Sequence, residues 1–551
     1  MRIIVHITLL VLLISSGFEV TAKTYYVNSK IGNDDNTGTR IYSPFKSLDK
    51  LSSLNFYPGD SLLLVSDCTF YGSLELRDVH GSQKRPIVIA SYPIDNTRNN
   101  QRANIDAKGN LNGILLENCS FVEFENISIS ANGGASYDRN EKELMRCGVL
   151  VMLSKRGSYE HIYLKNLLVN DVFFEEKGFL RGVNEVKTAN GSQNYGWGIR
   201  FINTCEGAFM NGIKIEGCVV KNIAHTGIKL TSKTEKHSLR NIEIKNNTVL
   251  ETGGPGIQMS GVENVLVRNN FINYSGSNND SRKWGRGSCL WTWGSNEVLI
   301  EKNHFLNAKG PGDSAGAHID YNCKNIVLQY NFSANNAGGF CEILGNNYNC
   351  AYRYNISVND GYRVKGENGA FQEGKIFWLS GYNGKRKRSG PFNTYFYNNT
   401  IYVNKAIKAN IAIDNGASGI FIANNIFCIE GETNAVLGDQ YNPEKESETN
   451  IENLVFQNNL YLKQSNWPKE LPIQDEQGVI GSPDFMNAGG DQIEDYIPIH
   501  AKLIKNKGME IFNIPNDSIG LSIGLKVEYD ILGNKIKGLP DMGAIELKNI
   551  R

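Results

Sequence analysis

Two carboxyl side chains and a histidine occur within a short part of the chain, in residues 317–320 and 340–343. Paired carboxyl groups carry out catalysis in most glycoside hydrolases, where a gap of about 5 Å suits a retaining enzyme and one of about 7 to 8 Å an inverting enzyme. Two carboxyl groups this close cannot both ionise easily, so one pKa should rise and make that group a general acid. We predict Asp320 and Glu342 as this pair, with their order unassigned, and His318 as the residue that positions or shuttles the proton.

Aromatic and charged residues near this pair are candidates for binding a sugar chain. Trp291 and Trp293 offer apolar faces for a sugar ring, and Asp313 lies in a glycine-rich loop that precedes the histidine. Arg363 and Lys365 supply basic groups. We predict these five residues as substrate contacts, although each residue type also occurs on ordinary solvated surfaces.

Other functions fit the same residues. A polysaccharide lyase would use Lys or Arg to abstract a proton and Ca²⁺ or Arg to neutralise an acidic sugar, and Arg363, Lys365 and the basic run 385–388 could serve it. We see no dense acidic cluster of the kind that Ca²⁺ prefers, so we expect no cofactor unless the protein is a lyase. A protein that only binds or adheres to glycans is the non-enzymatic alternative. We predict a glycoside hydrolase, because two tryptophans, a histidine and two carboxyl groups coincide in neighbouring repeats.

These residues lie inside a repeat that must position them. Alternating apolar and polar residues, an asparagine and a second alternation recur along the chain, with the asparagine at 222, 247, 270, 303, 331, 355, 399, 425 and 459. Period-2 alternation indicates strands, and an asparagine between two strands indicates a sharp bend. Such a unit, recurring every 23 residues or more, is typical of a parallel β-solenoid, whose coils bury their inner faces by stacking. We expect the asparagines to stack into a hydrogen-bonded ladder.

The ladder predicts which side chains face outward. His318 lies 13 residues before Asn331 and Glu342 lies 13 before Asn355, so His318 and Glu342 should stack on neighbouring strands. Alternation turns their apolar neighbours inward and turns His318, Asp320 and Glu342 outward. The same count places the two tryptophans on this face only if the register slips by one residue.

The segments at the two ends of the repeat give further evidence about the fold. Residues 43–51 predict a short helix that covers the open edge of the first coil. Segments at the start and end of the chain resemble those of secreted right-handed parallel β-helix proteins of the pectate-lyase-like superfamily; they are 25–27, 44–45, 58–60, 481–485, 529–534 and 540–546. The resemblance implies an all-β, right-handed parallel β-helix, a single-stranded solenoid, in a carbohydrate-active protein. That superfamily includes lyases, hydrolases, epimerases and adhesins, so the fold does not decide the reaction.

Composition, a predicted targeting segment and the cysteines limit which classes of protein this chain can belong to. The 551 residues carry 57 basic and 57 acidic side chains, without the basic excess that nucleic-acid binders need. Residues 1–22 predict a signal peptide, with an apolar run at 3–14, so we expect a secreted or periplasmic protein with no membrane insertion. Ten scattered cysteines favour buried thiols over zinc clusters or a disulfide framework.

The domain organisation follows from the repeat. Length alone would suggest roughly three or four domains, but a solenoid grows by adding coils and need not divide. We predict one domain, with the β-helix over residues 23–480 and a C-terminal coil and capping segment over residues 481–551. We expect a monomer that binds an oligosaccharide or polysaccharide.

Overall fold

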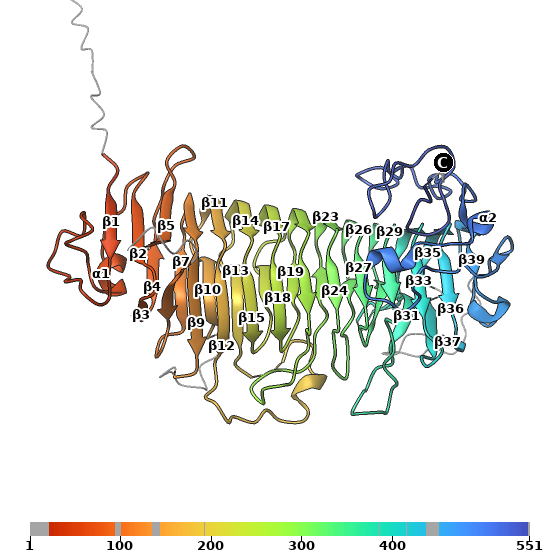
Figure 1. Cartoon of the computed structure of the whole chain (residues 1–551), viewed down its shortest axis with the longest axis horizontal. Coiled ribbons are helices and arrows are strands. Elements are labelled where there is room, and N and C mark those ends of the chain that lie inside the picture. The colour runs from red at the N-terminus through yellow and green to blue at the C-terminus, as the bar shows by residue number, and fades with distance from the viewer. Residues whose placement is uncertain are drawn as a thin grey trace, which may run out of the picture.

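Three long parallel sheets form the body of the protein (Figure 1). The computed structural model describes residues 21–93, 101–134, 144–191, 193–384, 386–414, 416–436 and 451–548, so residues 1–20 of the predicted signal peptide lie outside the described residues. Each sheet gains one strand per coil, and each strand pairs in parallel with its counterpart in the next coil. The all-β parallel β-helix expected from the repeat is confirmed.

The strands of the described residues divide among three sheets. Sheet A contains β1 (Thr24–Val27), β2 (Ser61–Val65), β5 (Ile87–Tyr92), β8 (Val122–Glu125), β11 (Gly157–Lys165), β14 (Ala208–Glu216), β17 (Leu239–Lys245), β20 (Glu263–Arg268), β23 (Asn296–Glu301), β26 (Lys324–Gln329), β29 (Tyr348–Arg353), β32 (Phe392–Tyr397), β35 (Ser418–Ala423) and β38 (Leu454–Gln457). Sheet B contains β3 (Thr69–Tyr71), β6 (Ala103–Asp106), β9 (Ile127–Asn132), β12 (Leu168–Phe173), β15 (Val219–Ile223), β18 (Thr248–Thr252), β21 (Phe271–Asn273), β24 (His304–Leu306), β27 (Phe332–Ala334), β30 (Ile356–Val358), β33 (Thr400–Val403), β36 (Ile426–Ile429), β39 (Leu460–Tyr461) and β40 (Val479–Ile480). Sheet C contains β4 (Leu74–Arg77), β7 (Asn112–Glu117), β10 (Arg146–Leu153), β13 (Gly196–Asn203), β16 (Ile228–Ser232), β19 (Ile257–Ser260), β22 (Leu290–Trp293), β25 (Ala317–Ile319), β28 (Gly339–Ile343), β31 (Lys375–Leu379), β34 (Ala409–Ile413) and β37 (Thr433–Val436).

Helices are short in the described part of the chain. They are α1 (Leu48–Ser52), α2 (Ala501–Ile504) and the 3-10 helices η1 (Glu185–Lys187), η2 (Gln464–Asn466) and η3 (Ile493–Tyr496). The predicted N-terminal helix is α1, where the Ser47 hydroxyl accepts a bond from the Lys50 amide at 3.1 Å and Leu48 and Leu51 are buried against the first coils. None of the described helices is long and apolar enough to span a membrane.

Buried asparagines tie the coils together along one edge of the core. The rungs of this ladder are Asn247, Asn270, Asn303, Asn331, Asn355, Asn399, Asn425 and Asn459. The Nδ2 of each rung donates to the Oδ1 of the next at 2.9–3.0 Å. The same Oδ1 accepts the backbone N–H of the preceding rung. Each amide therefore depends on neighbouring coils for its partners, which holds the coils in register.

The predicted first rung of the ladder is wrong. Asn222 lies inside β15 with a φ of 54°, and its amide donates to the Asp171 carboxylate of the preceding coil. Cys218 occupies the position before Asn247, and its backbone N–H donates to Asn247 Oδ1 at 2.9 Å. The left-handed bend belongs to the residue that precedes each rung, such as Asn246 with a φ of 57°. A lone asparagine therefore marks a bend without marking a rung.

The cysteines are small core residues. All ten are free thiols, and all except Cys205 are buried. Burial raises the pKa of these thiols, to about 12 at Cys147 and Cys289, so they stay neutral in the apolar interior. The expected burial of the cysteines is confirmed for all except Cys205.

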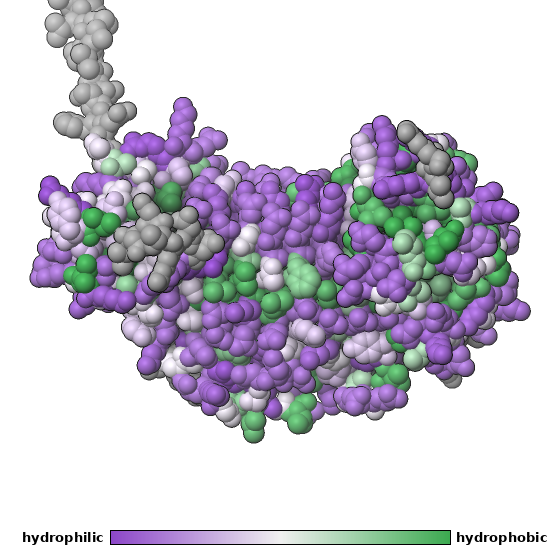
Figure 2. Space-filling model, in the orientation of Figure 1, coloured by the Kyte–Doolittle hydropathy of each residue, from purple (hydrophilic) through white to green (hydrophobic). Residues whose placement is uncertain are grey.

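The C-terminal part of the chain covers one end of the core and two of its outer faces. Trp467, Leu471 and Ile473 pack on the last coils, at the end opposite α1. Residues 481–548 then run over the outside of sheets A and B, where apolar side chains of the segment and the sheets form shared clusters. Figure 2 shows apolar residues gathered where this segment meets the solenoid. Among the described residues, neither cluster includes sheet C.

Removing one rung of the asparagine ladder should destabilise the solenoid. Asn303→Ala deletes an amide that donates to Val267 O and Asn331 Oδ1, both at 3.0 Å, and accepts from Asn270. We expect the free energy of unfolding to fall by about 3 kcal/mol, because buried donors and acceptors lose their partners. Chemical denaturation followed by circular dichroism measures the loss. Asn104→Ala removes a half-buried amide from the outside of β6 and should cost less than about 1 kcal/mol; equal losses at both positions would contradict the role of the ladder.

Candidate active site

One row of side chains crosses the outer face of sheet C from strand to strand. Its members, each directly paired with the next, are Arg200, Lys229, Gln258, Trp291, His318, Glu342 and Trp378. The pairing of Ile319 with Ile343 sets His318 beside Glu342, as the residue count predicts. Because neighbouring strands lie ~4.8 Å apart, this sheet C row extends over ~29 Å.

Trp291 joins the row through a one-residue slip in register. It pairs directly with His318, and the two rings lie 6.1 Å apart with their planes at 23°. The link from Thr292 to β23 is one residue shorter than the link from its partner Ile319 to β26, and this difference produces the slip. Trp291 and Trp293 both line the same cavity, so the condition that the sequence sets for the two tryptophans is met.

Loops close over the sheet C row and form a cavity of about 1180 Å³. The lining loops precede β13, β22, β25 and β31, and one follows β31. Arg286 holds two of them together, because its Nη1 donates to the backbone oxygens of Val186 and Thr188 at 3.0 and 3.1 Å. The predicted outward direction of His318 and Glu342 is correct, but the loops leave these residues only 6% and 8% exposed.

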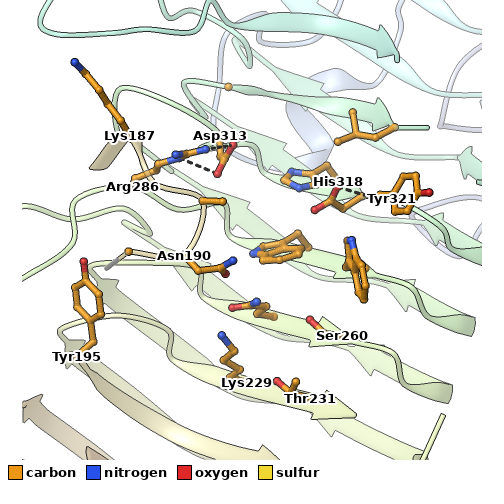
Figure 3. A pocket seen from close by; sticks show the side chains of 18 of the residues that line it. Lys187, Asn190, Tyr195, Lys229, Thr231, Ser260, Arg286, Asp313, His318 and Tyr321 are labelled. Atoms are coloured by element: carbon orange, nitrogen blue, oxygen red, sulfur yellow. Dashed lines mark hydrogen bonds and ion pairs between the residues drawn. The ribbon is translucent and has the colours of Figure 1, made fainter. Parts of the chain in front are cut away.

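Asp313 and Arg286 form a bidentate ion pair at the cavity (Figure 3). Arg286 Nε and Nη2 donate to Asp313 Oδ2 and Oδ1, each at 2.9 Å. Burial alone would raise the pKa of Asp313, but the Arg286 guanidinium, with His318 and Arg363, holds that pKa below its usual range. Asp313 is therefore ionised at neutral pH, and 31% of its side chain remains exposed. No local pattern predicts Arg286, which lies 27 residues from Asp313.

Asp320 and Glu342 differ from Asp313, because the pKa of each of these two carboxyl groups is raised rather than lowered. Burial raises the pKa of Asp320 to about 7, against a backbone hydrogen bond from the Tyr321 N–H at 2.7 Å, while Asp313 adds to the rise. Burial also raises the pKa of Glu342 to about 8, against the opposing charge of Lys375. The pKa of each group is therefore raised toward neutral pH, so the rise that the sequence predicts for one member of the pair occurs in both.

His318 is a neutral imidazole at physiological pH. Burial lowers its pKa to about 4, with Asp313 opposing the change and Arg286 adding to it. Its Nδ1 lies 3.3 Å from the Ser288 hydroxyl. A base this weak does not hold a proton near pH 7.

Of the two predicted basic contacts, Arg363 is among the residues that line the cavity and Lys365 is not. Arg363 is buried and donates to the backbone oxygens of Gln372 at 2.7 Å and Asp313 at 2.8 Å, so it holds the loops that cover the row. Lys365 is exposed and is not among the residues that line the cavity. Lys385, the first residue of the basic run, lies outside the described residues. Lys365 is therefore the predicted contact that the structure does not bring to the site.

Sequence reasoning missed the first half of the sheet C row. Arg200, Lys229 and Gln258 each follow Gly-Ile in successive coils, at 198–200, 227–229 and 256–258. A Cβ added to Gly198 would lie 2.4 Å from a backbone oxygen of the next coil, so the glycine marks a close contact between coils. The third residue of each triplet faces the cavity. This repeated triplet is the signal that would have identified these three residues.

The carboxyl groups influence one another but do not form a metal site. The pKa of Glu342 responds to both Asp313 and Asp320, and that of Asp320 responds to Asp313. Within the described ranges, no group of three or more His, Cys, Asp and Glu side chains could hold a metal ion. The cavity thus holds one carboxyl group with a lowered pKa, Asp313, beside two with raised pKa values, Asp320 and Glu342.

Sequence comparison finds two matches to this chain. The model of the right-handed β-helix region matches residues 197–401, which include the strands under the cavity. A lacto-N-biosidase from Bifidobacterium longum subsp. longum is 24% identical over 624 residues, covering 95% of this chain and 36% of that protein. The chain therefore spans about a third of the length of this curated relative.

Solved structures match the same architecture. A GH136 lacto-N-biosidase from Eubacterium ramulus is 20% identical, with a TM-score of 0.51, over 83% of this chain and 68% of that protein. XylC in complex with xylose has the same TM-score at 12% identity, over 95% of this chain and 98% of the other. Together with the right-handed β-helix match, these likenesses confirm the right-handed parallel β-helix expected from the sequence.

Replacing the buried acids with amides should stabilise the protein at alkaline pH. A carboxyl group with a raised folded pKa makes folding less favourable as pH rises from its unfolded pKa, about 4. The effect is complete above the folded pKa, about 7 for Asp320 and about 8 for Glu342. Asp320→Asn and Glu342→Gln remove it, so both variants should melt about 2–5 °C above the parent at about pH 8.5. At about pH 4 the melting temperatures should coincide.

Differential scanning calorimetry across this pH range measures the effect. Glu125→Gln, which replaces an exposed carboxyl group on β8, is the matched control and should change the melting temperature at neither pH. A gain of equal size at both pH values would show that packing, rather than ionisation, accounts for it.

Proposed function

We propose that this protein is a glycoside hydrolase that binds an oligosaccharide or polysaccharide along the sheet C row. One observation carries the proposal: a single cavity holds an ionised carboxylate, Asp313, and a carboxyl group whose pKa is raised to about 7, Asp320. Hydrolysis of a glycosidic bond needs this combination, because one group protonates the leaving oxygen while the other attacks the sugar or activates water.

Asp320 is the proton donor in this proposal. Its pKa of about 7 lies where a general acid is most effective at neutral pH. It is half-buried directly after β25, and its Oδ1 accepts the Tyr321 N–H, so Oδ2 is left for the substrate. Asp313 is the anionic partner, either the nucleophile of a retaining enzyme or the base of an inverting one. This assignment replaces the pair Asp320 and Glu342, because the pKa of Glu342 is raised by burial whereas that of Asp313 is lowered by Arg286, which makes Asp313 the better anion.

Glu342 and His318 act as positioning residues in this scheme. Glu342 is buried beside Lys375. A negative charge on Glu342 would oppose ionisation of the nearby Asp320. His318 lies between Trp291 and Glu342 in the row. As a neutral imidazole it presents a hydrogen-bonding group to the sugar without adding positive charge beside Asp313.

A relative with a named activity supports the same reaction class. The Bifidobacterium longum protein that matches 95% of this chain is a lacto-N-biosidase. Trp291 and Trp293 supply the aromatic faces on which sugar rings pack. Oligosaccharides that end in a lacto-N-biosyl group are therefore the first substrates to test.

A matched pair of substrates tests the two carboxyl roles: a lacto-N-biosyl oligosaccharide and the p-nitrophenyl glycoside of the same disaccharide. Asp320→Asn should lower kcat/KM on the oligosaccharide by about 10²–10⁴-fold, and far less on the aryl glycoside, whose leaving group needs no proton.

Asp313→Asn should lose activity on both substrates. If Asp313 is the nucleophile, azide should restore turnover of the aryl glycoside. The anomer of the first product, read by NMR, separates retention from inversion.

Other outcomes of the same experiment identify other functions. The control Glu125→Gln should keep full activity, and full activity in both Asp313→Asn and Asp320→Asn would contradict the assignment. A product with the ultraviolet absorbance of an unsaturated uronic acid would identify a lyase. Binding without cleavage across a broad glycan panel would identify a glycan-binding or adhesive protein.

We further propose a cofactor-free monomer that works outside the cytoplasm. The carboxyl groups supply both acid and anion, so the reaction needs no metal. The α1 helix and residues 467–473 cover the two ends of the stack, where a second copy would otherwise pair. The apolar run at residues 3–14 supports export. Activity should survive EDTA, and light scattering should give the mass of one chain; lost activity or a doubled mass would refute these proposals.

A further inference from the structure

Two cationic side chains form one end of the sheet C row. Arg200 on β13 and Lys229 on β16 are directly paired neighbours, ~4.8 Å apart along the sheet, and both line the cavity. Figure 3 shows Lys229 rising from its strand toward the cavity, on the same side of the sheet as His318. The two charges therefore face the space that the proposed substrate would occupy.

Neither cation has an acidic partner among the described residues. Arg200 Nε makes no hydrogen bond within this part of the chain, and the guanidinium stacks on the Trp197 ring with 4.4 Å between Cζ and the ring centroid. The charged neighbour that acts most on Lys229 is Arg200, which repels it. Enclosing two like charges without a counter-ion is unfavourable, and a negatively charged ligand would remove that cost.

The pair lies too far from the carboxyl groups to act on the scissile bond. Lys229 is three strands from His318 in the row, ~14 Å at the strand spacing. Between them, Gln258 and Ser260 line the cavity with neutral hydrogen-bonding groups. A sugar chain that lies along the row with its cleaved bond at the carboxyl groups would place a more distant sugar over the two cations.

We propose that Arg200 and Lys229 form a subsite for an anionic substituent of the glycan, either the carboxylate of an acidic sugar or a sulfate half-ester. This inference rests on the proposed function and names its substrate class, a glycan with a negative charge away from the cleaved bond. The planar guanidinium presents paired N–H donors that fit two oxygens of either group, and the ammonium adds a second positive charge.

The subsite should respond to pH through Lys229. Burial, together with repulsion from Arg200, lowers the pKa of Lys229 to about 7. The other titratable groups near it are the Cys147 thiol on β10, whose pKa is raised by burial, and the His225 imidazole in the preceding loop, whose pKa is lowered by burial. The neighbour on β19 is a neutral glutamine. Lys229 is thus charged below about pH 7 and neutral above it, so anion binding should weaken as pH rises.

Matched glycans on an array test the subsite in the Asp320→Asn background, where binding is measured without cleavage. Each set contains a neutral oligosaccharide, the same oligosaccharide with a carboxylated sugar, and the same oligosaccharide with a sulfate ester. At least one acidic form should bind about tenfold to a hundredfold more tightly than the neutral form at about pH 6, with a smaller advantage at about pH 8. Lys229→Gln and Arg200→Gln should remove this advantage, and Lys229→Arg should keep it.

Lys221→Gln is the matched control, because it removes an exposed lysine from the outer face of β15, and it should keep the advantage. A preference for the carboxylated or the sulfated form identifies which group supplies the charge. Equal binding of neutral and acidic forms, no binding of any acidic form, or an advantage that survives both glutamine variants would overturn the proposal.

The array separates this proposal from the proposed hydrolase, because binding is measured independently of turnover. A charge preference that depends on Lys229 and Arg200, in a protein that cleaves no glycan, would support the subsite and contradict the hydrolase. Cleavage of glycans by the parent protein without any charge preference would support the hydrolase and overturn the subsite.

Discussion

Each coil of this protein must stack in register on its neighbours, because its backbone groups and its buried asparagine amides find their partners there. A side chain at one position of a strand therefore lies beside its counterpart in the next strand. Residues at a repeated position become a row, and a row on an uncovered outer face becomes a binding surface. Loops between strands differ in length from coil to coil, and they close over the sheet C row without changing the spacing of the strands beneath it.

The loops that enclose the row also set the charge of its carboxyl groups. Removed from bulk water, Asp320 and Glu342 have raised pKa values, whereas Asp313 is ionised because Arg286 lies against it. A proton donor and an anion thus arise from the same residue type within one cavity. Farther along the row, Lys229 is enclosed beside a second cation rather than beside a carboxylate. Our proposals of a cleavage centre and of a distant anionic subsite both rest on this one enclosed row.

Particular residues show how far sequence patterns reach. The count from the ladder asparagines correctly set His318 beside Glu342, because the links between these strands and the ladder have equal lengths. The same count required a slip for Trp291, and the slip occurs because one link is a residue shorter. Asn222 was misplaced because a bend residue and a ladder rung look alike in sequence. Lys365 was expected at the site, but it is exposed on a loop whose course no periodic pattern describes.

The sequence by itself determined the solenoid, the stacking of its asparagines and the face on which His318, Asp320 and Glu342 lie. These are consequences of short-range patterns, since alternation and a repeated rung act within one coil and its neighbours. Only the tertiary structure decided which carboxyl groups have raised or lowered pKa values, that Arg286 pairs with Asp313, and that Arg200 and Lys229 face the cavity without an acidic partner among the described residues. Ionisation depends on how much water the surrounding loops exclude and on which distant side chains they bring near, and neither is a property of the local sequence.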